Sequence, residues 1–360
     1  MFIWIESPST EYDWSRHTDA FENLGLAGFK RDHLILGDLC ALEAACKNTN
    51  LSNRARAYFR SVTTKYPTLG GIRREVVPVI ARPDVLAPFT SDSKETIVPL
   101  DHFANEKSTG QVTIICEHLY DCKIICEIGR CVLRAKRLAG LASISMAKVP
   151  GGGGGIHLAL TDRMADPFSW GVCIVDSDRA HAAGKLGNTA RTCQIAYFAE
   201  PSSHWRWELH ILNARELENI IPIEAWAECL GSSGFALTDT IHERAWNVLG
   251  FLDSKQGDSL CRILKTPKSD SGRKLIEDAI TSVSRHLHPV YLQCASTKEC
   301  VGDNRCVLVA ADSSRLRKLS DWIDRQGNQL LSKVSFSGRP IEDIAQLVMS
   351  RGLAANISCV

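Results

Sequence analysis

The chain has 360 residues, of which 44% are hydrophobic and 23% charged, a composition typical of a globular protein of two or three domains. Its 42 basic residues balance 41 acidic ones, which excludes an overall basic field, so any nucleic-acid binding must use a local patch. The first residues, Met-Phe-Ile-Trp-Ile-Glu-Ser, are not typical of a signal peptide, and no apolar run reaches the length of a membrane span; we therefore expect a soluble, cytoplasmic protein.

Residues 1–109 form the first predicted segment, an N-terminal module. Residues 2–5 predict a short strand, residues 31–48 carry apolar side chains at helical spacing, and residues 53–66 predict a second, basic helix. The stretch 83–99 is rich in Pro, Ser and Thr, which favours a linker or long loop. These patterns predict a small α/β or mostly helical adaptor.

The basic helix at 53–66 is a candidate nucleic-acid surface. Cationic side chains interleaved with aromatic ones are typical of surfaces that contact phosphates and stack bases. A solvated helical face explains the same charges without a function. The candidate phosphate contacts are Arg54, Arg56 and Arg60, interleaved with Tyr58, Phe59 and Tyr66.

Residues 110–260 predict an α/β domain. Apolar runs that indicate buried strands alternate with stretches of helical periodicity, the pattern of a Rossmann-like parallel sheet flanked by helices. We expect strands at 112–116, 144–149, 172–175, 192–197 and 207–212, and helices at 121–140 and 156–166. Five consecutive glycines at 151–155 allow a sharp turn or a close approach of the backbone to a ligand.

Helical periodicity dominates after residue 213, and residues 261–360 predict a mostly helical C-terminal region. We expect helices at 214–229, 239–252, 272–288, 313–331 and 340–350, with one late strand at 306–311. The sequence thus predicts three segments, divided after residues 109 and 260.

Carboxylates follow two of the strands predicted in the α/β domain. The strand at 172–175 ends in Asp176 and Asp178, and alternate positions of an extended chain point the same way. Glu117 and Asp121 follow the first strand of the domain across a strand-to-helix turn. Ligands of open α/β sheets bind beyond the carboxyl ends of the strands, and buried carboxylates need a cation between them. We therefore predict a site for Mg²⁺, a hard cation that prefers oxygen ligands.

Helix-start acids, stabilised by the helix dipole, are the plainer interpretation of Glu117 and Asp121. A further polar group lies where the predicted strand at 207–212 leads into a helix. It comprises Arg215, Glu216, Glu218 and Asn219.

The order of these groups resembles the Toprim domain, the catalytic core of topoisomerases, primases and several nucleases. Glu117 after the first strand, Asp176-x-Asp178 after a later one and the downstream Arg-Glu-x-Glu-Asn are similar to Toprim nucleases of the overcoming-lysogenization-defect type and to stand-alone Toprim proteins of bacterial antiphage systems. The resemblance covers about residues 111–260. His118 departs from the family, which commonly has glycine there.

This resemblance implies a metal-dependent endonuclease that cleaves phosphodiester bonds in DNA or RNA with two Mg²⁺ or Mn²⁺ ions. Two ions can hold the attacking water and the leaving oxygen together. The resemblance assigns Glu117, Asp176 and Asp178 to the first ion, and Asp121 and Glu218 to the second. The nucleases of this type use a downstream lysine, for which Lys255 is the candidate; Lys255 or Arg215 would neutralise charge that develops on the phosphate.

The resemblance also implies an effector of a defence system that works with an ATPase sensor. No Walker motif occurs in this chain, so the ATPase would be a separate subunit; a homo-oligomer is compatible with the sequence. A dehalogenase-type phosphatase with Asp176 as nucleophile is one alternative, although Arg179 fits it poorly. A non-catalytic module that binds nucleic acid or protein is another. In that case Arg215 and Glu218 form a surface ion pair, and Lys255 is an ordinary loop residue.

Overall fold

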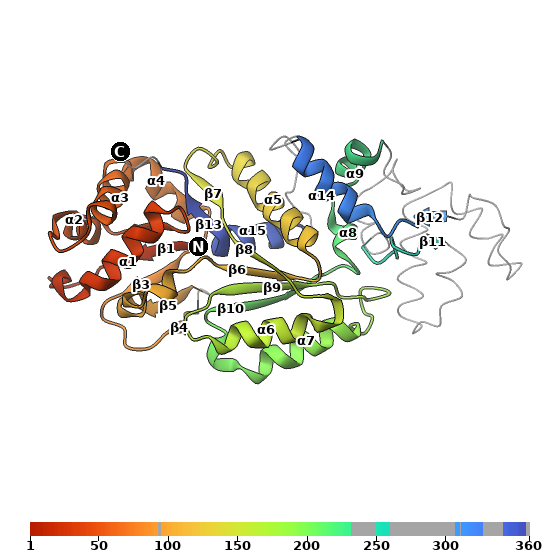
Figure 1. Ribbon diagram of the computed structural model, residues 1–360, viewed down its shortest axis with the longest axis horizontal. Coiled ribbons are helices and arrows are strands. Elements are labelled where there is room, and N and C mark those ends of the chain that lie inside the picture. The colour runs from red at the N-terminus through yellow and green to blue at the C-terminus, as the bar shows by residue number, and fades with distance from the viewer. Residues whose placement is uncertain (93–94, 232–249, 260–306, 310, 327–340, 358–360) are drawn as a thin grey trace, which may run out of the picture. The chain divides into compact units, whose positions relative to one another are not determined.

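The structure is a computed structural model that describes residues 1–92, 95–231, 250–259, 307–309, 311–326 and 341–357. The chain divides into two compact units. The first comprises residues 1–173, 195–209 and 342–360, and the second comprises residues 174–194 and 210–341. Both are described separately below. The fold is α/β, with mostly parallel sheets flanked by helices, as the sequence predicts (Figure 1).

The first unit begins with a five-stranded sheet of order β2-β1-β3-β5-β4. Its four parallel strands are β1 (Phe2–Ile5), β2 (Leu34–Gly37), β3 (Val79–Arg82) and β5 (Thr96–Pro99), and the short β4 (Phe89–Thr90) is antiparallel at one edge. Every residue of β1 and β2 is buried, which is why these strands are continuous apolar runs rather than alternating ones.

Helices α1 (Thr18–Phe29), α2 (Leu39–Lys47), α3 (Asn53–Thr64) and α4 (Tyr66–Leu69) pack around this sheet. The Tyr58 hydroxyl of α3 donates to Ile35 O over 3.0 Å and accepts from Ile35 N over 2.9 Å, so it pairs the outer edge of β2. Gly28 of α1 packs against the Tyr58 ring, since a Cβ there would lie 2.3 Å from it.

Two predictions for this unit are wrong. The predicted helix at 31–48 is the strand β2 followed by α2, because the buried run Leu34–Gly37 has no polar face. The predicted linker at 83–99 contains β4 and β5, and Val98 of β5 is fully buried. Pro and Ser flank a strand here rather than replace it. The strand at 2–5 and the helix at 53–66 are confirmed.

A four-stranded sheet of order β10-β9-β6-β8 carries the carboxylates. It consists of β6 (Thr113–Cys116), β8 (Ala147–Pro150), β9 (Gly171–Val175) and β10 (Trp207–Ile211), and β6 pairs in parallel with both β8 and β9. Helices α5 (Leu119–Ala135) and α6 (Ile156–Ala165) lie on opposite sides of β6 and β8 in Figure 1. These elements confirm the predicted strands at 112–116, 172–175 and 207–212 and both predicted helices. The strand predicted at 144–149 is interrupted at residues 145–146, and its second part is β8.

The predicted strand at 192–197 is wrong, because these residues lie in the helix α7 (Asn188–Ala199). Ile195 and Phe198 are more than half exposed on it, so the apolar run does not mark a buried strand. The strands β9 and β10 and the helix α7 run from one unit into the other.

The end of the chain packs back onto the first unit. The strand β13 (Leu353–Ala355), which follows α15 (Ile341–Gly352), pairs antiparallel with β7 (Ala142–Ile144). The Met1 ammonium donates to Leu353 O over 2.7 Å. These contacts join the two ends of the chain within the first unit.

The second unit contains α8 (Leu217–Ile220), α9 (Ile223–Leu230), α14 (Arg315–Gln326) and a two-stranded sheet of β11 (Asp258–Ser259) and β12 (Val307–Val309). The predicted strand at 306–311 and the helices at 313–331 and 340–350 are confirmed in the parts that the structure describes. The single helix predicted at 214–229 is wrong, because α8 ends at Ile220 and α9 begins after Pro222, which cannot continue a helix. The predicted helix at 272–288 and most of the one at 239–252 lie outside the described residues. None of the helices that the structure describes is both long and apolar enough to cross a membrane.

Candidate active site in the second unit

A turn at the carboxyl end of β9 presents the first predicted acids. After Val175 the chain passes through Asp176, Ser177 and Asp178 beside the segment that leads from β10 to α8. The Ser177 hydroxyl donates to Ala214 O, and Asp178 N donates to Arg215 O over 2.9 Å. Leu212 N donates to Val175 O over 3.0 Å. These bonds join the turn after β9 to the start of α8 and fix both segments.

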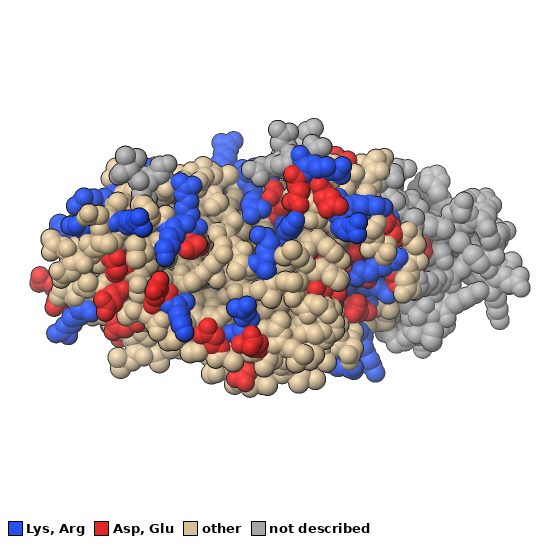
Figure 2. Space-filling model, in the orientation of Figure 1, with Lys and Arg blue, Asp and Glu red and all other residues tan. Residues whose placement is uncertain are grey.

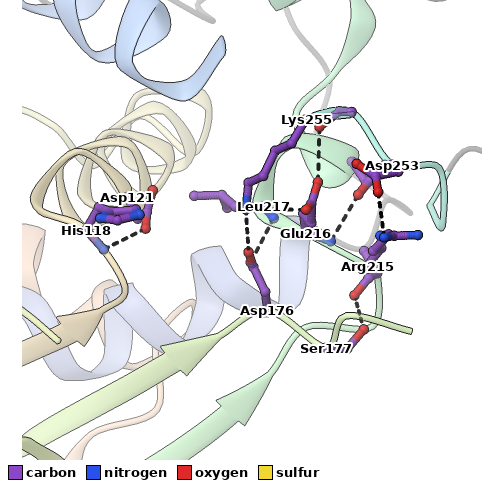
Figure 3. A network of polar contacts seen from close by, with 12 residues as sticks. His118, Asp121, Asp176, Ser177, Arg215, Glu216, Leu217, Asp253 and Lys255 are labelled. Atoms are coloured by element: carbon purple, nitrogen blue, oxygen red, sulfur yellow. Dashed lines mark hydrogen bonds and ion pairs between the residues drawn. The ribbon is translucent and has the colours of Figure 1, made fainter. Parts of the chain in front are cut away.

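Asp176 lies at the amino end of α8. Its Oδ1 accepts from Leu217 N over 3.0 Å, and its Oδ2 lies 3.7 Å from the Lys255 Nζ (Figure 3). A carboxylate is stabilised by free N–H groups at the start of a helix, and only 13% of the Asp176 side chain is exposed. Asp176 is therefore held between a helix start and a cation.

Glu216, immediately before α8, is the second acid at Lys255. Its Oε1 lies 3.3 Å from the Lys255 Nζ, and its Oε2 accepts from the Ser254 hydroxyl over 3.2 Å. Its backbone N–H donates to the Asn219 side chain over 3.0 Å. Burial raises the pKa of Glu216, and the Lys255 charge opposes that shift. Lys255 thus lies between two carboxylates, one of which is costly to ionise.

The loop that carries Lys255 is fixed by a second ion pair. Arg215 Nη2 donates to Asp253 Oδ2 over 2.7 Å, and the other oxygen of Asp253 accepts from Gln256 N over 2.8 Å. Asp253 N in turn donates to Asp258 over 3.0 Å. Gly257 completes the turn at a φ of 77° that disfavours other residues. Arg215 therefore fixes the loop that carries Lys255, the predicted site lysine.

Asp178 differs from its prediction. It was expected to point the same way as Asp176, but β9 ends at Val175 and the alternation of a strand does not continue into the turn. Asp178 has a φ of 52°, is exposed, and packs against Gly187, where a Cβ would lie 2.4 Å from its own Cβ. The two acids therefore have different surroundings.

Glu218 is buried and interacts with the charge of Arg315. Its side chain is 1% exposed. Burial lowers the pKa of Arg315, whose guanidinium lies over the Trp226 ring, and the charges of Asp312 and Glu218 oppose that shift. Arg215, the predicted surface partner of Glu218, pairs with Asp253 instead. Glu216, which lies 3.3 Å from the Lys255 ammonium group, belongs to the same Arg-Glu-x-Glu-Asn segment. The sequence offers no reason to prefer it to Glu218.

Glu117 and Asp121 belong to the first unit, after β6. Asp121 Oδ2 accepts from His118 N over 2.9 Å and closes the first turn of α5, so Asp121 serves as a helix-start acid. Glu117 is partly exposed, and its carbonyl accepts from Gly152 N over 3.1 Å. His118 stacks on Tyr120, with ring centroids 4.8 Å apart. The glycines at 151–155 thus make the sharp turn that the sequence suggests.

The basic helix α3 presents only part of its predicted surface. Arg54 and Arg60 are exposed, whereas Arg56 is half-buried and donates to the Asn53 side chain over 2.7 Å. Tyr58 and Phe59 are fully buried, so they cannot stack on bases. On the face shown in Figure 2, basic and acidic side chains are interspersed.

The donor atoms of the second unit suit a magnesium ion in kind. Mg²⁺ keeps several water ligands and is usually bound by one or two carboxylates together with substrate phosphate. Asp176 and Glu216 supply such carboxylates, each within 4 Å of the same ammonium group. Among the described residues, no three His, Cys, Asp or Glu side chains converge as a metal site. The acids therefore offer a two-carboxylate site, not a full protein cage.

No protein-family model matches this chain, and no curated protein or solved structure is detectably similar to it.

Proposed function

We propose that this chain is a metal-dependent endonuclease of the Toprim type, with its reaction centre at Asp176, Glu216 and Lys255. The observation that carries the proposal is the position of the Lys255 ammonium group, 3.7 Å from Asp176 and 3.3 Å from Glu216. Metal-assisted phosphodiester hydrolysis uses oxygen ligands that hold the metal ion and a cation that neutralises the charge developing on the phosphate. These three side chains supply both.

Asp176 and Glu216 would hold Mg²⁺ or Mn²⁺, which polarises the phosphodiester and lowers the pKa of a bound water. Both carboxylates are mostly buried, so their charge is costly without a cation. The 3.3 and 3.7 Å contacts to Lys255 exceed the 2.7–2.9 Å typical of strong charge-assisted hydrogen bonds. Lys255 therefore balances the acids without closing them to a metal ion.

Lys255 would contact the phosphate oxygens directly. Its side chain is 37% exposed, against 13% for Asp176 and 6% for Glu216, so it is the most accessible of the three to a substrate. Arg215 does not have this freedom, because its guanidinium pairs with the buried Asp253. We assign Lys255 to charge neutralisation and Arg215 to positioning of the lysine loop.

The remaining predicted ligands complete the proposal. The Toprim resemblance further assigns Glu117 and Asp178 to the first ion, and Asp121 and Glu218 to a second one. We further propose that the enzyme is the effector of an antiphage defence system, with a separate ATPase sensor subunit and DNA or RNA as substrate.

The test is cleavage of plasmid DNA and total RNA by the purified full chain with Mg²⁺, Mn²⁺ or EDTA. The variants are Asp176→Asn, Glu216→Gln and Lys255→Met, with Asp162→Asn, an exposed acid on α6, as the matched control. We expect metal-dependent cleavage in the wild type and the control, and a loss of at least about a hundredfold in the three site variants. Thermal melts of every variant separate lost chemistry from lost folding.

Wild-type protein that melts normally and cleaves neither substrate with either metal, alone or with a cognate ATPase, would overturn the proposal. A non-catalytic module that binds nucleic acid or protein would then remain, with Lys255 closing a purely structural ion-pair network.

A further inference from the structure

Two helices of the first unit end in the same unusual way. Helix α1 is followed by Lys30 and Arg31, and helix α5 by Lys136 and Arg137. Both arginines have a positive φ, 63° at Arg31 and 59° at Arg137. Apart from Asp178, they are the non-glycine residues with positive φ in the described part of the chain.

The hydrogen bonds at the two helix ends correspond one to one. Arg31 N donates to Gly28 O and the next N–H donates to Ala27 O; Arg137 N donates to Arg134 O and the next N–H to Leu133 O. Both pairs define a Schellman motif, whose left-handed position is usually occupied by glycine. The end of α9 shows the ordinary solution, since Gly231 has a φ of 75° there.

The left-handed backbone at these two positions is strained for arginine. We therefore look for an interaction of the side chain that offsets the strain. Both arginines are exposed, and neither has an ion pair that accounts for it among the described contacts. A cation does gain some stability from the dipole of a helix end. The neighbouring lysines already provide that charge, Lys30 exposed and Lys136 paired with Glu75 over 2.6 Å.

Residues 355–356 join the two helix ends. Ala355 N donates to His33 O over 3.2 Å, and Asn356 donates from its backbone to Leu141 O over 3.0 Å and from its side chain to Ala139 O over 3.1 Å. Only a few residues separate each arginine from these bonds. Even if those residues were fully extended, the two arginine Cα atoms would lie no more than about 30 Å apart. This upper limit is shorter than one helical turn of a nucleic-acid duplex, roughly 34 Å, so a single duplex is long enough to reach both arginines.

We propose that Arg31 and Arg137 are phosphate contacts of one nucleic-acid duplex, which binds across the ends of α1 and α5. The inference rests on the proposed function for its ligand class but uses none of the residues of the candidate active site. Both side chains are exposed, and a planar guanidinium suits a phosphate better than an ammonium does. The contacts are to the backbone, so the surface is sequence-independent.

The test is fluorescence anisotropy with DNA and RNA duplexes of about 20 base pairs, two helical turns, in EDTA so that cleavage plays no part. The double variant Arg31→Gly/Arg137→Gly removes both cations and relieves the strain. The control, Arg16→Ala/Arg163→Ala, removes two exposed arginines elsewhere in the same unit. The DNA and RNA arms identify the duplex that binds.

We expect the glycine variant to bind at least about tenfold more weakly and to lower the slope of log K against log salt by about 2, with no loss of melting temperature. Arg31→Asn/Arg137→Asn, which also tolerates left-handed backbone, repeats the test with another side chain. Binding equal to the control in both variants would overturn the inference, as would a wild type that binds neither duplex. Lost binding in a chain that never cleaves would support this surface and contradict the nuclease.

Discussion

The Arg215 guanidinium donates to the Asp253 carboxylate over 2.7 Å, and Asp253 is almost completely buried. This pair joins the segment before α8 to the loop that carries Lys255. Breaking a buried ion pair leaves one charge without its counterion and costs more than the pair itself contributes. The geometry of the candidate site therefore depends on a contact that makes no part of the proposed chemistry.

Asp253→Asn tests this dependence. We expect the free energy of unfolding to fall by about 3 kcal/mol, because the Arg215 charge loses its partner, and the proposed nuclease activity to fall with it. Urea unfolding measures the first effect. The double variant Arg215→Met/Asp253→Asn should recover more than half of the lost stability without recovering activity, because the loop that holds Lys255 is no longer braced. No difference between the single and double variants would contradict this account.

Glu216 predicts a specific dependence of stability on pH. Burial raises its pKa in the folded protein above the unfolded value, so the folded state holds the proton more tightly than the unfolded state does. The ionised form therefore costs stability, and this cost develops as pH rises through the folded pKa and vanishes below the unfolded pKa. Glu216→Gln carries no such titration.

The measurement is the difference in unfolding free energy between Glu216→Gln and wild type from pH 4 upward. We expect the variant to gain relative to wild type as pH rises. A difference that stays constant with pH would show that Lys255 offsets the burial of Glu216 completely.

How far the sequence predicts this site can be judged at Asp176 and Glu216. The sequence predicts β9 and the position of Asp176 at its end, because a fully buried parallel strand is a continuous hydrophobic stretch. The sequence does not predict which of Glu216 and Glu218 lies beside Lys255. Both lie in one short segment, and only the folded loop at Lys255 decides which carboxylate it meets.

Local patterns failed in the same way at α7 and β2. A short apolar run such as 192–197 fits a buried strand or one side of a helix equally well, and periodicity cannot separate the two. At β2, the apolar residues Leu34–Gly37 directly precede the helix α2, so the sequence pattern extends the predicted helix over the strand. In both cases the sheet pairing, a long-range property, determines the structure.

His102 gives a prediction for the first unit. Its ring lies among Phe103, Trp170 and Trp205, and burial, aided by the Arg206 charge, lowers its pKa to about 4. A histidine that is neutral when folded but has an unfolded pKa of about 6.5 loses stability as pH falls between those values. We expect about 3 kcal/mol of stability to be lost from pH 7 to pH 4 through this residue, at about 1.4 kcal/mol for each pKa unit.

His102→Gln should flatten this part of the pH profile, measured by urea unfolding at a series of pH values. His157, which is partly exposed near the start of α6, provides the control as His157→Gln. Equal slopes for wild type and His102→Gln would show that the ring is already charged in the folded protein.

Tyr58 separates the structural role of α3 from the predicted nucleic-acid surface. Its hydroxyl bonds both the N–H and the carbonyl of Ile35, so Tyr58→Phe leaves two backbone groups of a buried strand edge without their partner. We expect the free energy of unfolding to fall by about 2 kcal/mol. Because the ring is fully buried, duplex affinity should not change. Arg54→Ala/Arg60→Ala, made on the exposed face of the same helix, should show the reverse pattern if α3 contacts phosphates: unchanged stability and weaker, less salt-dependent binding. Loss of binding in Tyr58→Phe at full stability would contradict the assignment of this tyrosine to the core.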